Sequence, residues 1–333
     1  MDIGAVVVEH SQSRTDGAAA KIESEQAPVA VFAEKASAGP VGKVSKTPAF
    51  QAMHALRYKR QDLINEIEKV TGRKLICYLG GHNGEISRDD AVFFGDLLHN
   101  IPAGHPVDLM LQTPGGDIDA AEKLISMVRN RVGTATLRAI IPDYAKSAGT
   151  LIALGADVVM MSDSSELGPI DPQVTVVDSS GNRVTMPIHS YLEAFREHSD
   201  ALRKDPEDPV ARLMLGKMDP TKFKHFEMVM RRARTIAEEL LMQGMLRAPP
   251  ASSNVSYTAI AAALLDPNRW PSHGQVICAA DAIEIGLTVD HRSPDDVEWQ
   301  LFWQLYCYQR LDLNATTKFF ESSYVYLACE SAG

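Results

Sequence analysis

The sequence predicts an α/β fold with a mostly parallel sheet, and three observations lead to this prediction. Between residues 73 and 161, short apolar runs alternate with amphipathic helical segments. Strands that are separated by helices form crossover units, which place the strands parallel to one another. The chain has 333 residues, of which 45% are hydrophobic, so it can bury a large core.

The first half of the predicted fold follows this alternation. The clearest helical pattern lies within Asp117–Val132, where Ile118, Ala121, Ile125 and Val128 share one apolar stripe. The expected elements are, in chain order, a helix at Met53–Val70, a strand at Leu75–Leu79, a helix at Ser87–His99, a strand at Val107–Gln112, the helix just named, a strand at Thr134–Ile140, a helix beginning near Ser147 and a strand at Asp157–Met161.

From residue 174 onward the pattern changes to a hairpin followed by helices. The turn-forming residues Asp178 to Asn182 separate two short strand-like runs, which indicates the hairpin. The expected elements are strands at Val174–Val177 and Arg183–Met186, helices at Ser190–Arg203, Pro209–Lys217, Pro220 to about Arg247 and Tyr257–Leu265, and a closing helix and strand within Ala279–Val289.

Composition divides the chain into three expected parts. Residues 1–48 are rich in Ala, Ser, Glu, Lys and Gly and are predicted to be a disordered arm. Residues 49–290 are predicted to form the main domain. Residues 291–333 form a C-terminal extension with an aromatic string from Trp299 to Tyr308. That string has bulky residues on every side of a helix, so we expect either a subunit contact or packing within the chain.

Charge and cysteine content exclude several classes of protein. The 43 acidic and 33 basic residues give a net charge of −10, and no basic run indicates a nucleic-acid partner. The four cysteines lack metal-binding spacing, and scattered cysteines suit a reducing compartment. No secretory signal is recognisable, and no apolar stretch reaches the ~20 residues that span a bilayer. We therefore predict a cytoplasmic protein without a metal ion or other cofactor.

The first stretch with chemical potential is a Gly-Gly turn. A predicted buried strand ends in Thr113-Pro-Gly-Gly, and a predicted helix begins directly after Gly116. Glycines allow the backbone to turn tightly and to point its N–H groups into a cleft, where they can bind an anion or an oxyanion. An ordinary strand-to-helix turn is the alternative for this stretch.

The second stretch is a serine turn, Lys146-Ser-Ala-Gly-Thr150, which again lies between a strand and a helix. Ser147 there is either an ordinary helix cap or a nucleophile with small neighbours that leave room for a substrate carbonyl. Ser147 follows Gly116 by 31 residues, which is the length of one crossover unit. The two turns are therefore predicted to face the same end of the parallel sheet.

Four motifs in this order resemble the serine dehydrogenase proteinase family. They are Thr113-Pro-Gly-Gly-Asp117, Lys146-Ser-Ala-Gly-Thr150, Gly155-Ala-Asp157 and Leu167-Gly-Pro-Ile-Asp-Pro-Gln173. This family is part of the Clp/crotonase superfamily and is similar to signal peptide peptidase A. The resemblance implies a Clp/crotonase-like spiral of ββα units with a helical C-terminal portion. It also implies self-association and a Ser147 nucleophile.

The resemblance implies site residues around that nucleophile as well. Backbone N–H groups of Gly115, Gly116 and Ala148 are expected to form the oxyanion hole. Gly149 and Asp171 are expected to shape the cleft. A triad role for Asp171, which two prolines flank, requires a histidine partner.

The general base is the least defined part of this prediction. Clp-type enzymes have a histidine in the loop after the next strand, but residues 164–173 contain none. Signal peptide peptidases use a later lysine instead, and burial can lower a lysine pKa enough for that role. Lys217 lies among Leu213, Met214 and Met218, so we expect it to be the half-buried base of a Ser-Lys dyad. Lys204, Lys222 and Lys224 are the other candidate lysines, and His189 is the alternative base.

The sequence thus predicts a serine-type peptidase that hydrolyses peptide or protein substrates. It has no Walker loop, so any unfolding ATPase would be a separate partner chain. Two alternatives stay open, a crotonase-type acyl-CoA hydratase or isomerase and a catalytically silent oligomeric scaffold.

Overall fold

A computed structural model describes residues 47–177, 180–247 and 256–331 of the chain, and the predicted arm at residues 1–48 lies almost entirely outside them. The described part contains a seven-stranded sheet in the order β11-β10-β1-β2-β3-β5-β9. Five of these strands run parallel, and they are β1 (Lys74–Gly80), β2 (Val107–Gln112), β3 (Leu137–Ile140), β5 (Val158–Met161) and β9 (Val289–His291). The predicted α/β fold with a parallel-dominated sheet is therefore confirmed.

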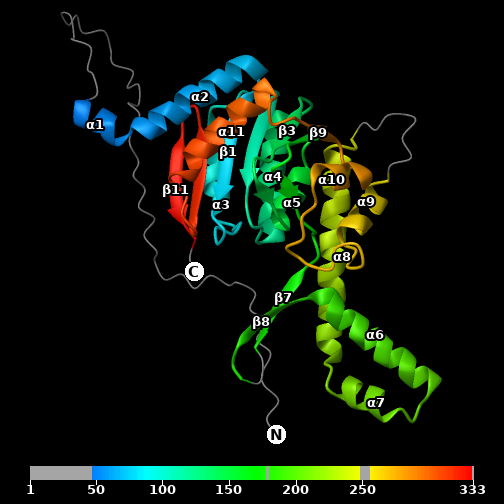
Figure 1. The fold of residues 1–333 in the computed structure, drawn as a ribbon. Coiled ribbons are helices and arrows are strands. Elements are labelled where there is room, and N and C mark those ends of the chain that lie inside the picture. The colour runs from blue at the N-terminus through cyan, green and yellow to red at the C-terminus, as the bar shows by residue number, and fades with distance from the viewer. Residues whose placement is uncertain (1–46, 178–179, 248–255, 332–333) are drawn as a thin grey trace, which may run out of the picture.

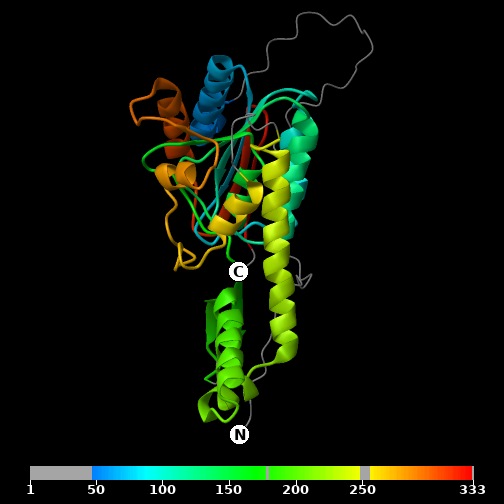
Figure 2. The same cartoon turned by 90° about the vertical axis from the view of Figure 1, so that its right-hand side faces the viewer.

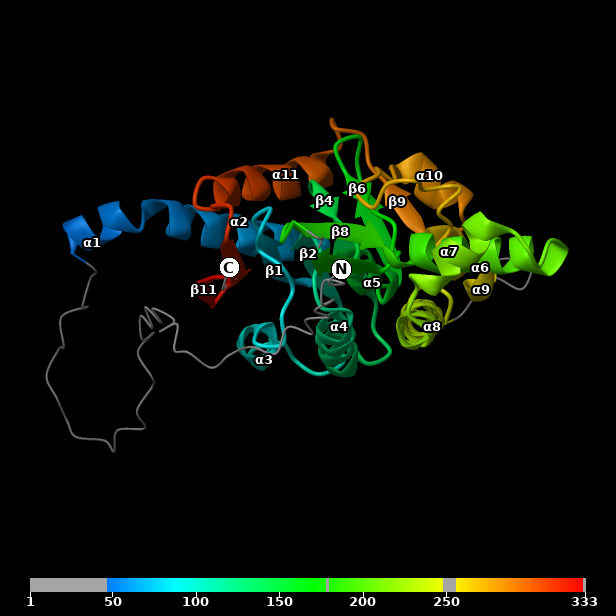
Figure 3. The same ribbon diagram turned by 90° about the horizontal axis from the view of Figure 1, so that it is seen from below.

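Helices cover both faces of this sheet, as Figure 3 shows from below. The helices of the described residues are α1 (Pro48–Met53), α2 (Ala55–Thr71), α3 (Asp90–His99), α4 (Ile118–Val132), α5 (Ala148–Leu154), α6 (Ile188–Lys204), α7 (Pro209–Gly216), α8 (Pro220–Gln243), α9 (Tyr257–Leu264), α10 (Ala279–Glu284) and α11 (Val297–Arg310). Helices α2 and α11 lie on one face of the sheet, and α3 and α4 lie on the other.

Alternating side chains of each strand feed two separate cores. In β1, Ile76 and Tyr78 join the large cluster that contains α3, α4 and α5. Leu75, Cys77 and Leu79 point the other way and pack with α2 and α11. This alternation is the period of two that places successive strand residues on opposite faces of a sheet.

The last forty residues are built into the sheet. Strand β10 (Thr317–Ser322) pairs antiparallel with β1, and β11 (Tyr326–Glu330) pairs antiparallel with β10. Helical structure was predicted for the C-terminal portion, and these two strands were not. In the aromatic string, Trp299, Phe302 and Tyr306 are buried in the core beside α2. Packing within the chain, one of the two expectations, thus accounts for these side chains.

A separate arm extends from this body, as Figures 1 and 2 show. It consists of the hairpin of β7 (Gln173–Val177) and β8 (Arg183–Pro187), followed by α6, α7 and the first part of α8. Its own core is small, and its buried residues are Val174, Ile188, Leu192 and Phe226. Helix α8 runs from the arm into the body, where Ala237 and Leu240 join the main core.

Two very short strands complete the site-bearing region. Strand β4 (Tyr144–Ala145) pairs in parallel with β6 (Glu166–Leu167), beyond the carboxyl ends of the main strands. Isolated bridges extend this pair to Thr113 on one side and to Ile277 on the other. Three of the four motif segments thus meet beyond the carboxyl ends of the parallel strands, which is where ligands bind in open α/β folds. The fourth, Gly155-Ala-Asp157, lies at the amino ends, where the Asp157 N–H donates to the Leu137 carbonyl oxygen at the start of β3 (2.8 Å).

Candidate active site

The Gly-Gly turn has a backbone that only glycine adopts readily. Gly115 has φ 112° and Gly116 has φ 138°. The turn ends where the Asp117 side chain caps α4 by accepting hydrogen bonds from the N–H groups of Asp119 (2.8 Å) and Ala120 (3.1 Å). The expected tight turn between a buried strand and a helix is therefore present.

Ile86 holds this turn from the opposite side. Its N–H donates to the Gly115 carbonyl oxygen (2.7 Å), and its own carbonyl oxygen accepts from the Asp117 N–H (3.0 Å). A Cβ atom on Gly116 would lie 2.5 Å from the Ile86 carbonyl oxygen. The Gly116 N–H consequently points away from Ile86, and among the described residues it has no acceptor. Sequence reasoning did not identify Ile86, because no local pattern marks its pairing with a turn.

Ser147 occupies a strained backbone position at the start of α5. Its φ of 51° is the only positive value among the non-glycine residues of the described part. Such a conformation costs about 1–3 kcal/mol and persists only where surrounding structure enforces it. The side chain makes no cap hydrogen bond. The Ser147 hydroxyl therefore does not cap α5.

The structure brings the two turns together, as the crossover spacing predicts. The Thr113 N–H donates to the Tyr144 carbonyl oxygen (3.1 Å), and the Lys146 N–H donates to the Thr113 carbonyl oxygen (3.0 Å). A Cβ atom on Gly115 would lie 2.8 Å from Ser147 Cβ and 3.4 Å from the Ala148 nitrogen. The absence of a side chain at Gly115 is thus what allows the two turns to touch.

The three expected oxyanion-hole amides differ in availability. The Gly115 N–H donates to Thr113 Oγ1 (3.2 Å), so it is already occupied. The N–H groups of Gly116 and Ala148 have no acceptor within the described part of the chain. Gly149 packs against the Thr113 side chain, where a Cβ atom would approach Thr113 Cγ2 to 2.4 Å. Gly149 therefore allows the two turns to pack closely against each other.

Lys146 precedes the serine, but its amine is used elsewhere. Its Nζ donates to the carbonyl oxygens of Leu167 (3.0 Å) and Gln275 (3.2 Å) and pairs with Glu166 at 3.2 Å. Burial lowers the pKa of this amine, and the Glu166 carboxylate opposes part of that shift. Lys146 therefore ties the serine turn to β6 and to the segment around residue 275.

The structure does not bring Lys217 to this place. Lys217 follows the last turn of α7, in the arm that extends away from the sheet (Figure 1). The expected half-buried setting is wrong, because Lys217 is exposed and its neighbours Leu213 and Met214 are 59% and 42% exposed. The apolar residues around it face outward, which the sequence pattern alone did not reveal.

Asp171 is paired with a histidine that lies far from it in the sequence. Its Oδ1 lies 2.7 Å from His273 Nδ1, across a sequence separation of 102 residues. Its Oδ2 accepts a hydrogen bond from Gln173 Nε2 (2.6 Å), and the residue is only 4% exposed. Sequence analysis missed this pair, although the turn Ser272-His-Gly274 was the available signal.

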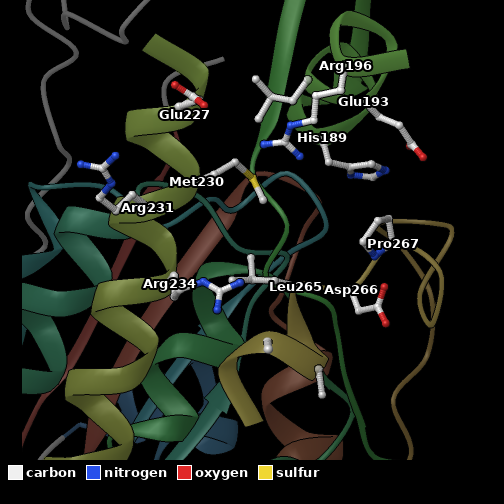
Figure 4. Close-up of a pocket in the computed structure, with 13 residues that line it drawn as sticks. His189, Glu193, Arg196, Glu227, Met230, Arg231, Arg234, Leu265, Asp266 and Pro267 are labelled. Atoms are coloured by element: carbon white, nitrogen blue, oxygen red, sulfur yellow. The ribbon is translucent and has the colours of Figure 1, made fainter. Parts of the chain in front are cut away.

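His189, the alternative base, lines a cavity at the root of the arm. This cavity of about 890 Å³ lies between α6, α8 and residues 262–267 (Figure 4). The Nδ1 atom of His189 is buried there without a hydrogen-bond partner in the described residues. Ser147 does not line this cavity.

Comparison with known proteins identifies the segment that contains both turns. The family model of ClpP-like, SDH-type serine proteinases matches residues 86–201. The resemblance predicted from the four motifs is thereby confirmed, while Lys217 and His273 lie beyond the matched segment.

Two curated relatives are uncharacterised proteins of Methanocaldococcus jannaschii. MJ0137 is 44% identical over 73 residues, which is 22% of this chain and 25% of that protein. MJ1495 is 33% identical over 128 residues, which is 35% of this chain and 42% of that protein. The chain thus spans less than half the length of either relative in these matches.

Solved structures with partial similarity include two proteases. One is the membrane-bound stomatin-specific protease 1510-N, at a TM-score of 0.40 and 16% identity over 69% of this chain and 84% of the other. The other is ClpP1 from Listeria monocytogenes, at a TM-score of 0.36 and 12% identity over 71% of this chain and 96% of the other. In this chain, none of the described helices is both long and apolar enough to cross a membrane.

Proposed function

We propose that the chain is a serine-type peptidase in which Ser147 is the nucleophile. The observation that carries the proposal is the forced φ of 51° at Ser147, directly against Gly115 and beside two amides without acceptors. A serine held on a strained turn next to preorganised N–H donors is suited to attack a carbonyl. The match of residues 86–201 to a serine proteinase family supports the same activity.

In the proposed reaction, Ser147 Oγ bonds to the carbonyl carbon of the substrate and loses its proton to a base. The oxyanion that forms accepts hydrogen bonds from the N–H groups of Gly116 and Ala148. The C–N bond then breaks as the amine leaves with a proton, and water hydrolyses the acyl-enzyme. Each oxyanion donor contributes a factor of about 10²–10³ in rate in acyl transfer.

Lys217, the base predicted from the sequence, is one candidate for this role, and it must meet a geometric condition. Because it is exposed on the arm, it can reach a Ser147 hydroxyl only when another copy of the chain delivers it. Self-association and a separate ATPase partner are likewise proposals, and sedimentation velocity of the full chain tests the first.

Labelling with a fluorophosphonate probe tests the nucleophile. The full chain should be labelled, Ser147→Ala should not be, and the arm variant Ser190→Ala should be labelled like wild type. Ser147→Ala should change the free energy of unfolding by at most about 0.5–1 kcal/mol, because its side chain caps nothing. Undiminished labelling of Ser147→Ala would show that the nucleophile is misassigned.

The same experiment separates the alternatives. An acyl-CoA hydratase or isomerase of this superfamily would bind CoA thioesters and resist the probe. A catalytically silent scaffold would do neither. Retention on immobilised CoA, compared between wild type and Ser147→Ala, therefore accompanies the probe experiment.

A further inference from the structure

We propose that His273, oriented by Asp171, is the general base for Ser147; this inference rests on the peptidase function proposed above. In this assignment the base belongs to a His–Asp pair inside the body and not to a lysine of the arm. The pair also differs in sequence position from the loop histidine that a Clp-type enzyme has, since residues 164–173 contain none.

Strand pairing places the His273 segment at the same end of the short sheet as Ser147. Ala145 pairs with Leu167 in parallel, so residues that follow Ala145 and residues that follow Leu167 leave in the same direction. Leu167 pairs with Ile277 in the antiparallel sense, so residues before Ile277 face residues after Leu167. Ser147, Asp171 and His273 therefore all lie beyond this one end.

Lys146 fixes the distance between these segments. Its amine donates to the carbonyl oxygens of both Leu167 and Gln275, so the residue before Ser147 is bonded to the chain two residues after His273. Gly168 lets this side chain pass, because a Cβ atom there would lie 2.7 Å from Lys146 Cδ. The serine turn and the histidine loop are thus linked by direct hydrogen bonds.

Asp171 gives His273 the tautomer that a base needs. The carboxylate accepts one hydrogen bond from Gln173 and one from His273 Nδ1, which fixes the ring proton on Nδ1. The other ring nitrogen, Nε2, has no hydrogen-bond partner among the described residues, and the side chain is 30% exposed. A buried carboxylate on Nδ1 and a free Nε2 are the arrangement that orients a catalytic histidine.

Other titratable groups in the described part fit this role less well. The Lys146 amine is held by two carbonyl oxygens and Glu166, and Lys217 is on the arm. His291 pairs with Asp163, but that carboxylate is 66% exposed. His189 lines the cavity of Figure 4 without a carboxylate bonded to its ring.

The proposed step balances protons within the pair. His273 Nε2 accepts the Ser147 Oγ proton as Oγ bonds to the carbonyl carbon, and the resulting imidazolium gives that proton to the departing amine. In the second half-reaction, Nε2 takes a proton from water and returns it to Oγ. Ser147 Oγ makes no hydrogen bond within the described residues, so we assign the Nε2–Oγ contact to the substrate-bound state.

The experiment measures the rate of fluorophosphonate labelling of the full chain against pH. Asp171 is the charged group that is bonded to the ring, and Lys146, which pairs with Glu166, is bonded to the same loop at the Gln275 carbonyl oxygen. Wild-type labelling should depend on the His273 ring, because Nε2 must accept the Ser147 proton. His273→Ala should lower the rate by about 10²–10⁴-fold and change its pH profile, and Asp171→Asn should lower the rate by a similar factor. Added imidazole should restore part of the rate of His273→Ala.

Matched controls keep the result decisive. His291→Ala removes the other His–Asp pair and should leave the rate and pH profile unchanged. If His273→Ala fails to fold, His273→Gln and Asp171→Asn report instead, each checked by thermal melting. Wild-type labelling by a folded His273 variant overturns the base assignment alone, because loss of labelling in Ser147→Ala would still support the peptidase. Labelling of Ser147→Ala would overturn the proposed function itself.

Discussion

The body and the arm of this molecule differ in how they place charged side chains. In the body, charged side chains are buried and paired, as Lys318 is with Asp90 and Arg60 is with Glu321. In the arm, Lys217 is exposed beside apolar residues that are exposed as well. Backbone geometry suited to chemistry, such as the strained Ser147, occurs where buried bonds fix it. The proposed catalytic groups therefore belong to the body, and the predictions below test that division.

Among the variants of this comparison, the largest effect is expected from Gly116→Ala, in the part of the body that is proposed to form the oxyanion hole. The new Cβ atom would lie 2.5 Å from the Ile86 carbonyl oxygen at φ 138°, so the turn must shift and carry its N–H away. Fluorophosphonate labelling should slow by about 10²–10³-fold. Gly95→Ala in α3 is the control, because nothing lies within 4 Å of its added Cβ atom. Equal labelling of Gly116→Ala and wild type would contradict the proposed oxyanion hole.

A smaller effect is expected from Lys318→Met, which acts on the oxyanion turn from β10. Lys318 Nζ donates to the Glu85 carbonyl oxygen (3.1 Å) and to Ser87 Oγ (3.0 Å), and these residues flank the Ile86 that holds Gly116. Its loss leaves Asp90 buried without its cation, which costs about 3–5 kcal/mol of stability. Labelling of the folded variant should slow by about 10-fold, the order expected when an orienting contact is lost.

Arg60→Met is the matched control for Lys318→Met. Arg60 pairs with Glu321, also on β10, at a buried Nε–Oε1 distance of 2.9 Å. The contact lies toward α2, so its loss should destabilise the fold comparably and leave the labelling rate of folded protein unchanged. Both rates are measured at a temperature well below each melting transition. A similar rate loss in the two variants would mean that destabilisation alone explains the Lys318 effect.

A third prediction concerns Lys146, whose amine bonds join the serine turn to the His273 segment. Because burial lowers the pKa of Lys146 in the folded state, the unfolded state binds more protons between that lowered pKa and the ordinary value of about 10.5. The contribution of Lys146 to stability should therefore grow as pH rises through this window. Denaturant unfolding of wild type and Lys146→Met from pH 7 to 10.5 measures it. A stability difference that shrinks with rising pH would contradict the direction of this shift.

The smallest effect is expected in the arm, from Lys217→Ala. An exposed side chain after the end of α7 should contribute little to stability, within about 0.5 kcal/mol. If the base lies in the body, the labelling rate of Lys217→Ala should stay within about twofold of wild type. Loss of the base itself would lower the rate by about 10²–10⁴-fold. Inactive Lys217→Ala and Lys217→Arg would instead restore the Ser-Lys dyad and would require a second copy to supply the lysine.

Local sequence patterns predicted much of the fold and one half of the candidate site. The strand Val107–Gln112 has the predicted bounds, because a short, mostly apolar run directly before a Gly-Gly turn favours a buried strand. Both turns were recognised from glycine, proline and serine at strand-to-helix junctions. Their contact followed from the length of one crossover unit. These features depend on neighbours within about 30 residues, so the sequence by itself determines them.

The remaining features were decided only by the tertiary structure. Strand β10 buries the charged residues Lys318 and Glu321, which in the sequence are typical of an exposed segment. Their partners Asp90 and Arg60 lie 228 and 261 residues away in the chain. The histidine that pairs with Asp171 likewise lies 102 residues away in the chain. Lys217 is exposed, contrary to expectation, because the apolar side chains of α7 face outward. Contacts between distant segments leave no periodic signal in either one. They form because buried charges and hydrogen-bonding groups must find partners in the folded chain.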